Sequence, residues 1–304
     1  MNDTLTNPGV LVINKEQGFT SHDCVNIVRR LTGIKKAGHT GTLDPEATGV
    51  LPVFLGKATR AIQYVDDREK IYLFKLMLGK RSDTFDIWGE IQPKTTVEEA
   101  ALKEIKREDI EKALKHFLGD IKQVPPIYSS IKKKGKPLYK YARAGIEVEV
   151  PPRNVRIEEL ELLDYDDNKK EATLRVQCSK GTYIRSLCND MGNLLETGGL
   201  MSYLVREANG QFKLVDSFKL SEINNEQELL KRMIPLNKVL LNLGTIMGTK
   251  DDFEALKDGK ALTIKENSII RTNEEGIYFI EYENNVISIG KLTDLTFKPD
   301  KVLI

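Results

Sequence analysis

The sequence is poor in the residues that build disulfide frameworks and metal sites. Its only cysteines and histidines are Cys24, Cys178, Cys188, His22, His39 and His116. The cysteines form no Cys-x-x-Cys pair and are odd in number, so we expect reduced, mostly buried thiols. The histidines lack the spacing of metal ligands, so no metal site is predicted.

Long apolar runs and a strong net charge are also missing. No segment is apolar enough to span a bilayer and the first twelve residues show no cleavable signal, so we expect a cytoplasmic protein that binds no membrane. The 46 Lys and Arg residues nearly balance the 45 Asp and Glu residues. Net charge therefore argues neither for nor against a nucleic-acid partner, and an RNA-binding surface would require uneven placement of cations.

The most informative stretch is residues 38 to 53, which reads Gly-His-Thr-Gly-Thr-Leu-Asp-Pro-Glu-Ala-Thr-Gly-Val-Leu-Pro-Val. Its glycines and prolines exclude a long helix and argue against an uninterrupted central strand. The apolar run from Val50 predicts burial, so we expect a tight surface loop, carrying His39 and Asp44, next to a core strand. Pro45 biases Asp44 away from the helical region and makes the turn stiff. In isolation, Leu-Asp-Pro would indicate an ordinary turn.

This sixteen-residue string resembles, nearly position for position, the catalytic motif of the TruB family, the bacterial tRNA pseudouridine-55 synthases. Two further strings are similar to family motifs: residues 79–84, which follow Tyr72, and residues 178–185, which end in Tyr-Ile-Arg. One turn departs from the family pattern Lys-Pro-x-Gly, because Glu16 stands in place of the proline after Lys15. The resemblance covers essentially the full chain.

The resemblance implies that the chain isomerises uridine to pseudouridine at position 55 in the T-loop of tRNA, with Asp44 as the essential catalytic residue. It implies that Tyr72 and Leu204 lie at the active site, with Tyr72 as a proton acceptor or relay. Taken alone, Tyr72 reads as a core tyrosine of a strand. Whether Asp44 attacks C1′ or promotes a glycal route stays open. An isomerisation needs no redox cofactor or nucleotide, so no cofactor is expected.

Arg185 is a third candidate for catalysis. It follows Thr182, which can cap a helix, and would therefore lie in that helix's first turn. A cation at this end opposes the helix macrodipole, which suggests a carboxylate partner, and Asp44 is the candidate. A guanidinium suits the role because it stays protonated and offers a planar fork.

Residues 120–156 gather cations and tyrosines, with few acidic residues among them. We expect an insertion at about 124–152 to contact RNA through four cations in particular: Lys132, Lys133, Lys136 and Arg143. Cations neutralise phosphates, and the interleaved tyrosines could stack on unpaired bases. An exposed lysine-rich loop without a partner is the alternative. Lys15 and His39 complete the expected RNA contacts, with His39 stacking where bases are displaced.

The expected fold class is α/β (α+β): a catalytic domain at 1–246 around a mixed, largely antiparallel sheet, and a small β-rich domain at 247–304. The second domain is similar to PUA modules, which bind RNA. We expect strands at 70–78, 172–178 and 203–207, and helix over 95–119, which Gly119 ends. We expect a short helix from residue 56 to about residue 66.

Other function classes stay open on the residues alone. A glycosidase or nucleosidase would need two carboxylates, and only Asp44 is a strong candidate. A non-catalytic tRNA-binding or tRNA-folding protein would use the basic segment and the C-terminal module alone. The expected partner is the tRNA T-stem-loop, and the expected oligomeric state is a monomer.

Overall fold

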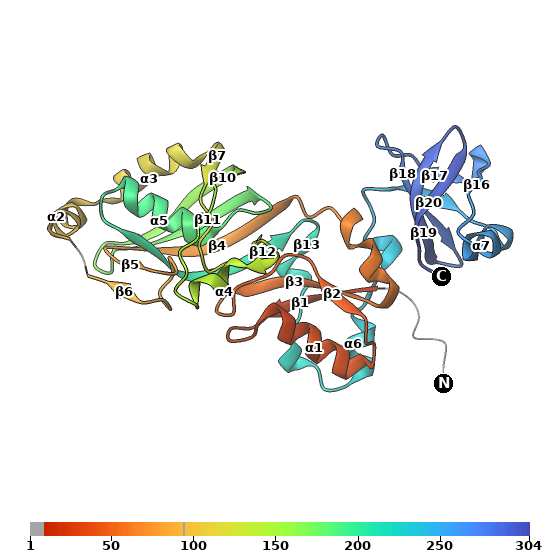
Figure 1. Ribbon diagram of the computed structural model, residues 1–304, viewed down its shortest axis with the longest axis horizontal. Coiled ribbons are helices and arrows are strands. Elements are labelled where there is room, and N and C mark those ends of the chain that lie inside the picture. The colour runs from red at the N-terminus through yellow and green to blue at the C-terminus, as the bar shows by residue number, and fades with distance from the viewer. Residues whose placement is uncertain (1–8, 94) are drawn as a thin grey trace. The chain divides into compact units, whose positions relative to one another are not determined.

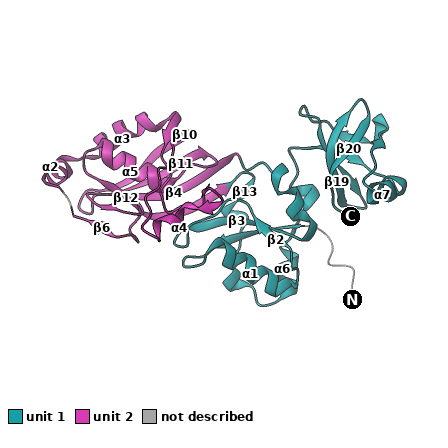
Figure 2. Ribbon diagram, in the orientation of Figure 1, with its two compact units in different colours: residues 1–67, 209–304 teal, residues 68–208 magenta. Residues whose placement is uncertain are grey.

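The computed structural model describes residues 9–93 and 95–304, which form two compact units (Figure 1, Figure 2). Unit 1 comprises residues 1–67 and 209–304, and unit 2 comprises residues 68–208. Within the described ranges, no helix is both long and apolar enough to cross a membrane.

The N-terminal part of unit 1 is a small antiparallel sheet covered by two helices. Its elements are β1 (Gly9–Lys15), α1 (Ser21–Thr32), β2 (Ala37–His39), β3 (Thr48–Leu55), α6 (Glu226–Lys231) and β14 (Ile234–Pro235). β1 pairs with β14 and β3, and β2 pairs with β3. α1 and α6 contact each other beneath the sheet (Figure 1), where Leu11, Leu51 and Val28 share one apolar cluster.

Helix α1 begins and ends where its local sequence dictates. Thr20 is its N-cap and forms a capping box with Asp23, so two backbone donors are satisfied reciprocally. Gly33 ends the helix in the left-handed region with φ of 65°, where glycine carries no steric penalty. His22 lies on the exposed surface of this helix.

The C-terminal part of unit 1 is a six-stranded sheet in the order β16-β20-β19-β18-β15-β17. Its strands are β15 (Gly244–Met247), β16 (Leu262–Thr263), β17 (Ile269–Arg271), β18 (Ile277–Tyr282), β19 (Asn285–Thr293) and β20 (Thr296–Val302). The expected strand-rich character is confirmed, although the sequence reasoning missed helix α7 (Lys250–Lys257). The hairpin between β18 and β19 turns at Glu283 and Asn284, both with positive φ.

One apolar cluster joins the two parts of unit 1. It runs from Val12 and Phe54 on the N-terminal strands, through Ala58 on the 3-10 segment η2 (Gly56–Tyr64), to Phe279 and Ile289 on β18 and β19. Polar contacts support it: Arg60 donates to the main-chain oxygen of Val302, and the Tyr64 hydroxyl donates to Asp300. The C-terminal sheet therefore shares a core with the strands beside the Asp44 loop.

Unit 2 is built on a run of strands in the order β12-β4-β11-β10-β7, in which β4, β11, β10 and β7 pair antiparallel. These are β4 (Glu69–Leu78), β7 (Gly119–Gln123), β10 (Arg153–Asp166), β11 (Glu171–Ser179) and β12 (Gly199–Asn209), whose last residue belongs to unit 1. The main helices are α2 (Thr96–Glu104), α3 (Arg107–Leu114) and α5 (Ile184–Leu194). α3 packs against β10 and α5 against β4 (Figure 1). The expected mixed, largely antiparallel sheet is confirmed.

Three elements differ in detail from the expectations. Segment 95–119 is helical, but an extended Ile105 divides it into α2 and α3, and 115–117 is 3-10. The helix expected after residue 56 is the 3-10 segment η2. Stretch 38–53 is not one strand, as expected, although β3 itself runs through Pro52, which lies opposite Val12 of β1. The proline is tolerated there because its missing donor falls where β2 has just ended.

Candidate active site

The loop at 40–47, between β2 and β3, carries Asp44 and is tied down on both sides of that residue. The ammonium of Lys15 donates to the main-chain oxygen of Pro45 at 2.8 Å, and the amide of Gly18 donates to the same oxygen. Before Asp44, the hydroxyl of Ser21 accepts from the amide of Leu43 at 2.9 Å and donates to its carbonyl at 3.2 Å. The half-buried Asp44 thus stands on a turn with fixed flanks.

Lys15 is fully buried, and its ammonium also donates to the carbonyl oxygens of Glu16 and Phe19. Three carbonyl acceptors balance the cost of burying an ammonium. The sequence reasoning assigned Lys15 to RNA contact, and the geometry places its charge under the Asp44 turn instead.

The departure at Glu16 has a structural counterpart. Its carboxylate accepts from the hydroxyl and the amide of Ser221, in the 3-10 segment η5 (Leu220–Glu222). The next residue, Gln17, donates to Glu46 at 2.9 Å, two residues past Asp44. Side-chain hydrogen bonds therefore hold a turn that a proline would hold by its ring.

His39 does not lie on the expected loop. It is the last residue of β2, opposite Val53, and it is half-buried. The loop prediction failed because three residues of β2 are too few to leave a period-two pattern in the sequence.

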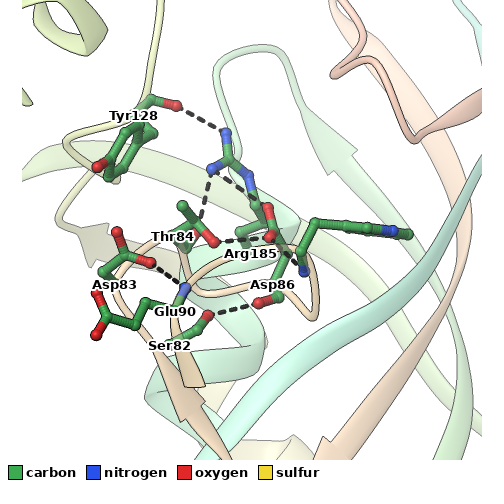
Figure 3. A network of polar contacts seen from close by, with 8 residues as sticks. Ser82, Asp83, Thr84, Asp86, Glu90, Tyr128 and Arg185 are labelled. Atoms are coloured by element: carbon green, nitrogen blue, oxygen red, sulfur yellow. Dashed lines mark hydrogen bonds and ion pairs between the residues drawn. The ribbon is translucent and has the colours of Figure 1, made fainter. Parts of the chain in front are cut away.

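Arg185 lies in the first turn of α5, as expected, and is 5 % exposed. It donates to the main-chain oxygens of Thr84 at 3.0 Å and Tyr128 at 2.9 Å, and its Nη1 lies 3.7 Å from Oδ2 of Asp86 (Figure 3). The arginine thereby joins the loop after β4 to the beginning of the basic insertion. Its pairing with Asp44 stays a prediction.

Asp86 is a candidate functional residue that the sequence reasoning missed. It is buried, and its Oδ1 accepts from the hydroxyl of Thr84 at 2.7 Å (Figure 3) and from the amide of Trp88 at 3.1 Å. These bonds turn the other carboxylate oxygen toward Arg185. The sequence does contain a signal for Asp86: it is a carboxylate in a turn-rich segment, two residues after the Asp-Thr pair at 83–84.

The first turn of α5 is anchored by the side chain of a residue distant in the sequence rather than by a side-chain cap of its own. Thr182 was expected to cap the helix, but its hydroxyl donates to Ser179 and the N-cap is Tyr183. The buried Gln123 accepts from the Tyr183 amide at 2.7 Å and donates to the Tyr183 oxygen at 3.0 Å. A distant amide therefore fixes where the helix begins, and with it Arg185.

Tyr72 and Leu204 are both buried, on β4 and β12. Tyr72 lies opposite Val176 of β11 and is 7 % exposed. Burial agrees with a core tyrosine and with a site tyrosine alike, so the catalytic role of Tyr72 stays a prediction.

The basic insertion folds into a short hairpin and a helical turn: β8 (Lys132–Lys133), β9 (Lys136–Pro137) and α4 (Leu138–Ala142). Two of its tyrosine rings lie against cations of the insertion itself. The Lys136 ammonium lies 4.8 Å from the ring centroid of Tyr141, and the Arg143 guanidinium lies 5.6 Å from that of Tyr139. Such cation–π contacts position a charge while leaving it hydrated.

The family model and the curated relatives place the chain in the class of pseudouridine synthases, enzymes that modify RNA. Residues 29–184 match the model of the TruB family pseudouridylate synthase N-terminal domain. This chain belongs to the TruB family of pseudouridylate synthases.

Curated relatives agree with this membership, and a solved structure shares the fold. A tRNA pseudouridine synthase B of Geobacillus thermodenitrificans is 44% identical over 263 residues, 84% of this chain and 86% of that protein. The protein of the same name from Clostridium kluyveri is 38% identical over 97% of this chain and 99% of its own. A chain in the crystal structure of a Cbf5-Nop10-Gar1 complex shares the fold, with a TM-score of 0.70, 24% identity, and coverage of 99% of this chain and 87% of that chain.

Proposed function

We propose that this chain isomerises the uridine at position 55 in the T-loop of tRNA to pseudouridine, with Asp44 as its essential carboxylate. Membership of the TruB family carries the proposal. The near-full-length likeness to relatives named tRNA pseudouridine synthase B supports tRNA as the substrate.

The reaction breaks the N1–C1′ bond of uridine, turns the base and forms a C5–C1′ bond. C5 loses its proton and N1 gains one, so atoms and electrons balance without an oxidant or reductant. The step requires an ionised carboxylate at the sugar, which an ordinary aspartate supplies at neutral pH. The turn that holds Asp44 supports this role, because a fixed carboxylate needs little reorganisation.

Arg185 and Tyr72 complete the proposed chemistry. Arg185 pairs with the Asp44 carboxylate and keeps it charged and directed. Its ties to Asp86, Thr84 and Tyr128 support the role, since they orient the guanidinium before substrate binds. Tyr72 accepts or relays the proton that moves during the isomerisation.

The target base lies inside a folded RNA loop and has to be flipped out to reach Asp44. His39 stacks where bases are displaced, and Leu204 packs beside the reacting nucleotide. Lys15 serves the site through Pro45, because its ammonium is buried against three carbonyl oxygens.

The insertion at 124–152 binds the T-stem-loop through the four cations Lys132, Lys133, Lys136 and Arg143. The domain at 247–304 acts as a PUA-like RNA-binding module beside a catalytic domain at 1–246. One pair supports RNA binding by the C-terminal module: Lys291 of β19 lies directly opposite Lys298 of β20, and both are exposed. Directly opposed like charges destabilise a sheet, and a bound phosphate would relieve the repulsion.

The test uses in vitro transcribed tRNA and purified protein, with pseudouridine mapped by carbodiimide modification and primer extension. The wild type is expected to give one new stop at the T-loop uridine, and Asp44→Asn none while it still binds tRNA. tRNA binding without a stop in the wild type would favour a non-catalytic binding protein, and release of uracil would favour a nucleosidase.

A further inference from the structure

The starting point is a hydrogen bond that the β2–β3 ladder cannot form. The register places His39 opposite Val53, so the next pair is Thr40 and Pro52. The Thr40 amide donates to the Pro52 oxygen at 3.2 Å. A hydrogen-bonded antiparallel pair exchanges two such bonds, but proline has no N–H to return one. The carbonyl of Thr40 is therefore left without its ladder donor at the point where the chain enters the Asp44 loop.

The side chain of Asn209 supplies this donor. Its Nδ2 lies 3.2 Å from the carbonyl oxygen of Thr40 and 3.2 Å from the Thr40 hydroxyl. Asn209 is fully buried and Thr40 is 4 % exposed, so water does not compete for either group. Because the carbonyl accepts but cannot donate, the contact also fixes which end of the amide faces Thr40.

The other end of the same amide indicates why an asparagine stands here. Oδ1 of Asn209 is buried and accepts no hydrogen bond from any residue in the described ranges. An unpaired buried acceptor destabilises a folded chain, so stability alone does not favour this amide. Sites where a sequence breaks a packing rule are often the ones that serve function.

We propose that Asn209 is a positioning residue for Asp44: its amide replaces the hydrogen bond that Pro52 cannot donate, and so fixes where the chain leaves β2 and begins the catalytic loop. This role rests on the proposed function of Asp44. Lys15 and Ser21 hold the loop near Asp44 itself, whereas Asn209 holds its entrance at Thr40. Without the amide, the loop pivots at Thr40 and the carboxylate loses its alignment.

The first experiment is a rescue. Asn209→Leu keeps a branched side chain of the same number of heavy atoms and removes the donor, and Pro52→Ala in that background returns an N–H opposite the Thr40 carbonyl. Single-turnover rates with saturating tRNA are expected to fall at least tenfold in Asn209→Leu, with tRNA affinity within twofold of wild type. The double variant is expected to recover most of the rate.

The second experiment uses pH and remains valid if Asn209→Leu does not fold. In Asn209→Asp, the ionised carboxylate repels the Thr40 carbonyl, whereas the protonated carboxyl donates to it, and burial raises its pKa. The rate relative to wild type is expected to rise up to tenfold for each unit by which pH is lowered from 8 toward 5.5. Nearby titratable groups at His39, Asp44, Asp66 and Asp67 occur in both proteins, so the ratio removes their contribution.

A wild-type rate in Asn209→Leu would overturn the proposal. So would a slow Asn209→Leu that Pro52→Ala does not rescue, together with a slow Asn209→Asp that acid does not rescue. A wild type that forms no pseudouridine would overturn the proposed function instead. Hydrogen exchange then tests the positioning separately: Asn209→Leu is expected to speed exchange of the amides at 40–47 at least tenfold, and unchanged exchange would contradict it.

Discussion

The ammonium of Lys15 donates a hydrogen bond to the main-chain oxygen of Pro45, thirty residues away in the chain and directly after Asp44. Through this contact the buried ammonium supports the turn that carries Asp44. Because Lys15 also donates to Glu16 and Phe19, it joins the β1–α1 connection to the Asp44 loop as one rigid assembly.

Replacing Lys15 with methionine keeps the aliphatic stem and leaves three carbonyl groups without their charged donor. The free energy of unfolding is expected to fall by about 3 kcal/mol, and kcat at least tenfold with little change in tRNA affinity. Lys35→Met, at an exposed lysine, is the matched control and is expected to change stability by less than about 0.5 kcal/mol. Urea unfolding and single-turnover kinetics measure both, and equal behaviour of the two variants would refute the role of Lys15.

The Asp86 carboxylate balances the charge of Arg185 in a buried setting. Asp86→Asn keeps the shape, removes the charge and permits an NH₂ group to face the guanidinium. The free energy of unfolding is expected to fall by about 2 kcal/mol and the single-turnover rate at least tenfold. Asp83→Asn, on the same loop but exposed, is the control, because its amide oxygen can still accept from Glu90. A rate loss in the control that matches Asp86→Asn would contradict this account.

The two neighbouring lysines of the insertion are expected to differ in their effect on tRNA binding. Lys132 is exposed, whereas the ammonium of Lys133 already donates to the Glu149 oxygen at 2.8 Å. Lys132→Ala is expected to lower the slope of log Kd against log salt concentration by about 1, the contribution of one phosphate contact. Lys133→Ala is expected to lower this slope by less. Filter binding between 50 and 300 mM salt measures the slopes. The Debye length at the low end of this range is roughly twice that at the high end. Identical slopes for both variants and wild type would exclude the insertion as the phosphate-binding surface.

The Tyr139 ring is expected to serve Arg143 rather than a base. Tyr139→Phe keeps the cation–π face and should bind tRNA as wild type does, whereas Tyr139→Leu should weaken binding and lower the salt slope as Arg143→Ala does. Weakened binding in Tyr139→Leu with an unchanged salt slope would point to base stacking instead.

The contact between Tyr64 and Asp300 predicts a pH dependence of stability in unit 1. Burial, the hydrogen bond to Asp300 and its charge raise the pKa of Tyr64 to about 12. Because the pKa of Tyr64 is raised in the folded state, its hydrogen bond to Asp300 contributes fully to the free energy of unfolding below the ordinary tyrosine pKa near 10. This contribution is lost as the pH rises toward 12. Tyr64→Phe is expected to cost about 1 kcal/mol at pH 8, since the site is partly exposed. Urea unfolding of both proteins should converge near pH 12, and a constant difference would contradict the assignment.

Local features of the fold were readable from the sequence, and contacts between distant segments were not. Thr20, Asp23 and Gly33 lie within fourteen residues and mark both ends of α1, so capping rules suffice to place this helix. The support of Asp44 by Lys15, and of Arg185 by Asp86, depends on which segments meet in space, and no local pattern records this. Pro52 shows the same limit: the amide of Asn209, 157 positions later, donates to Thr40 where Pro52 cannot, and no local window of the sequence records this contact.

The central claim is that this chain isomerises a T-loop uridine through Asp44, and tritium release measures it most directly. A tRNA transcript made with uridine labelled at C5 loses tritium when C5 bonds to C1′. One equivalent per tRNA is expected from the wild type, and none from Asp44→Asn or from a transcript with cytidine at position 55. Release from the cytidine transcript would contradict the assigned position, release by Asp44→Asn would contradict the assigned carboxylate, and no release by the wild type would contradict the reaction itself.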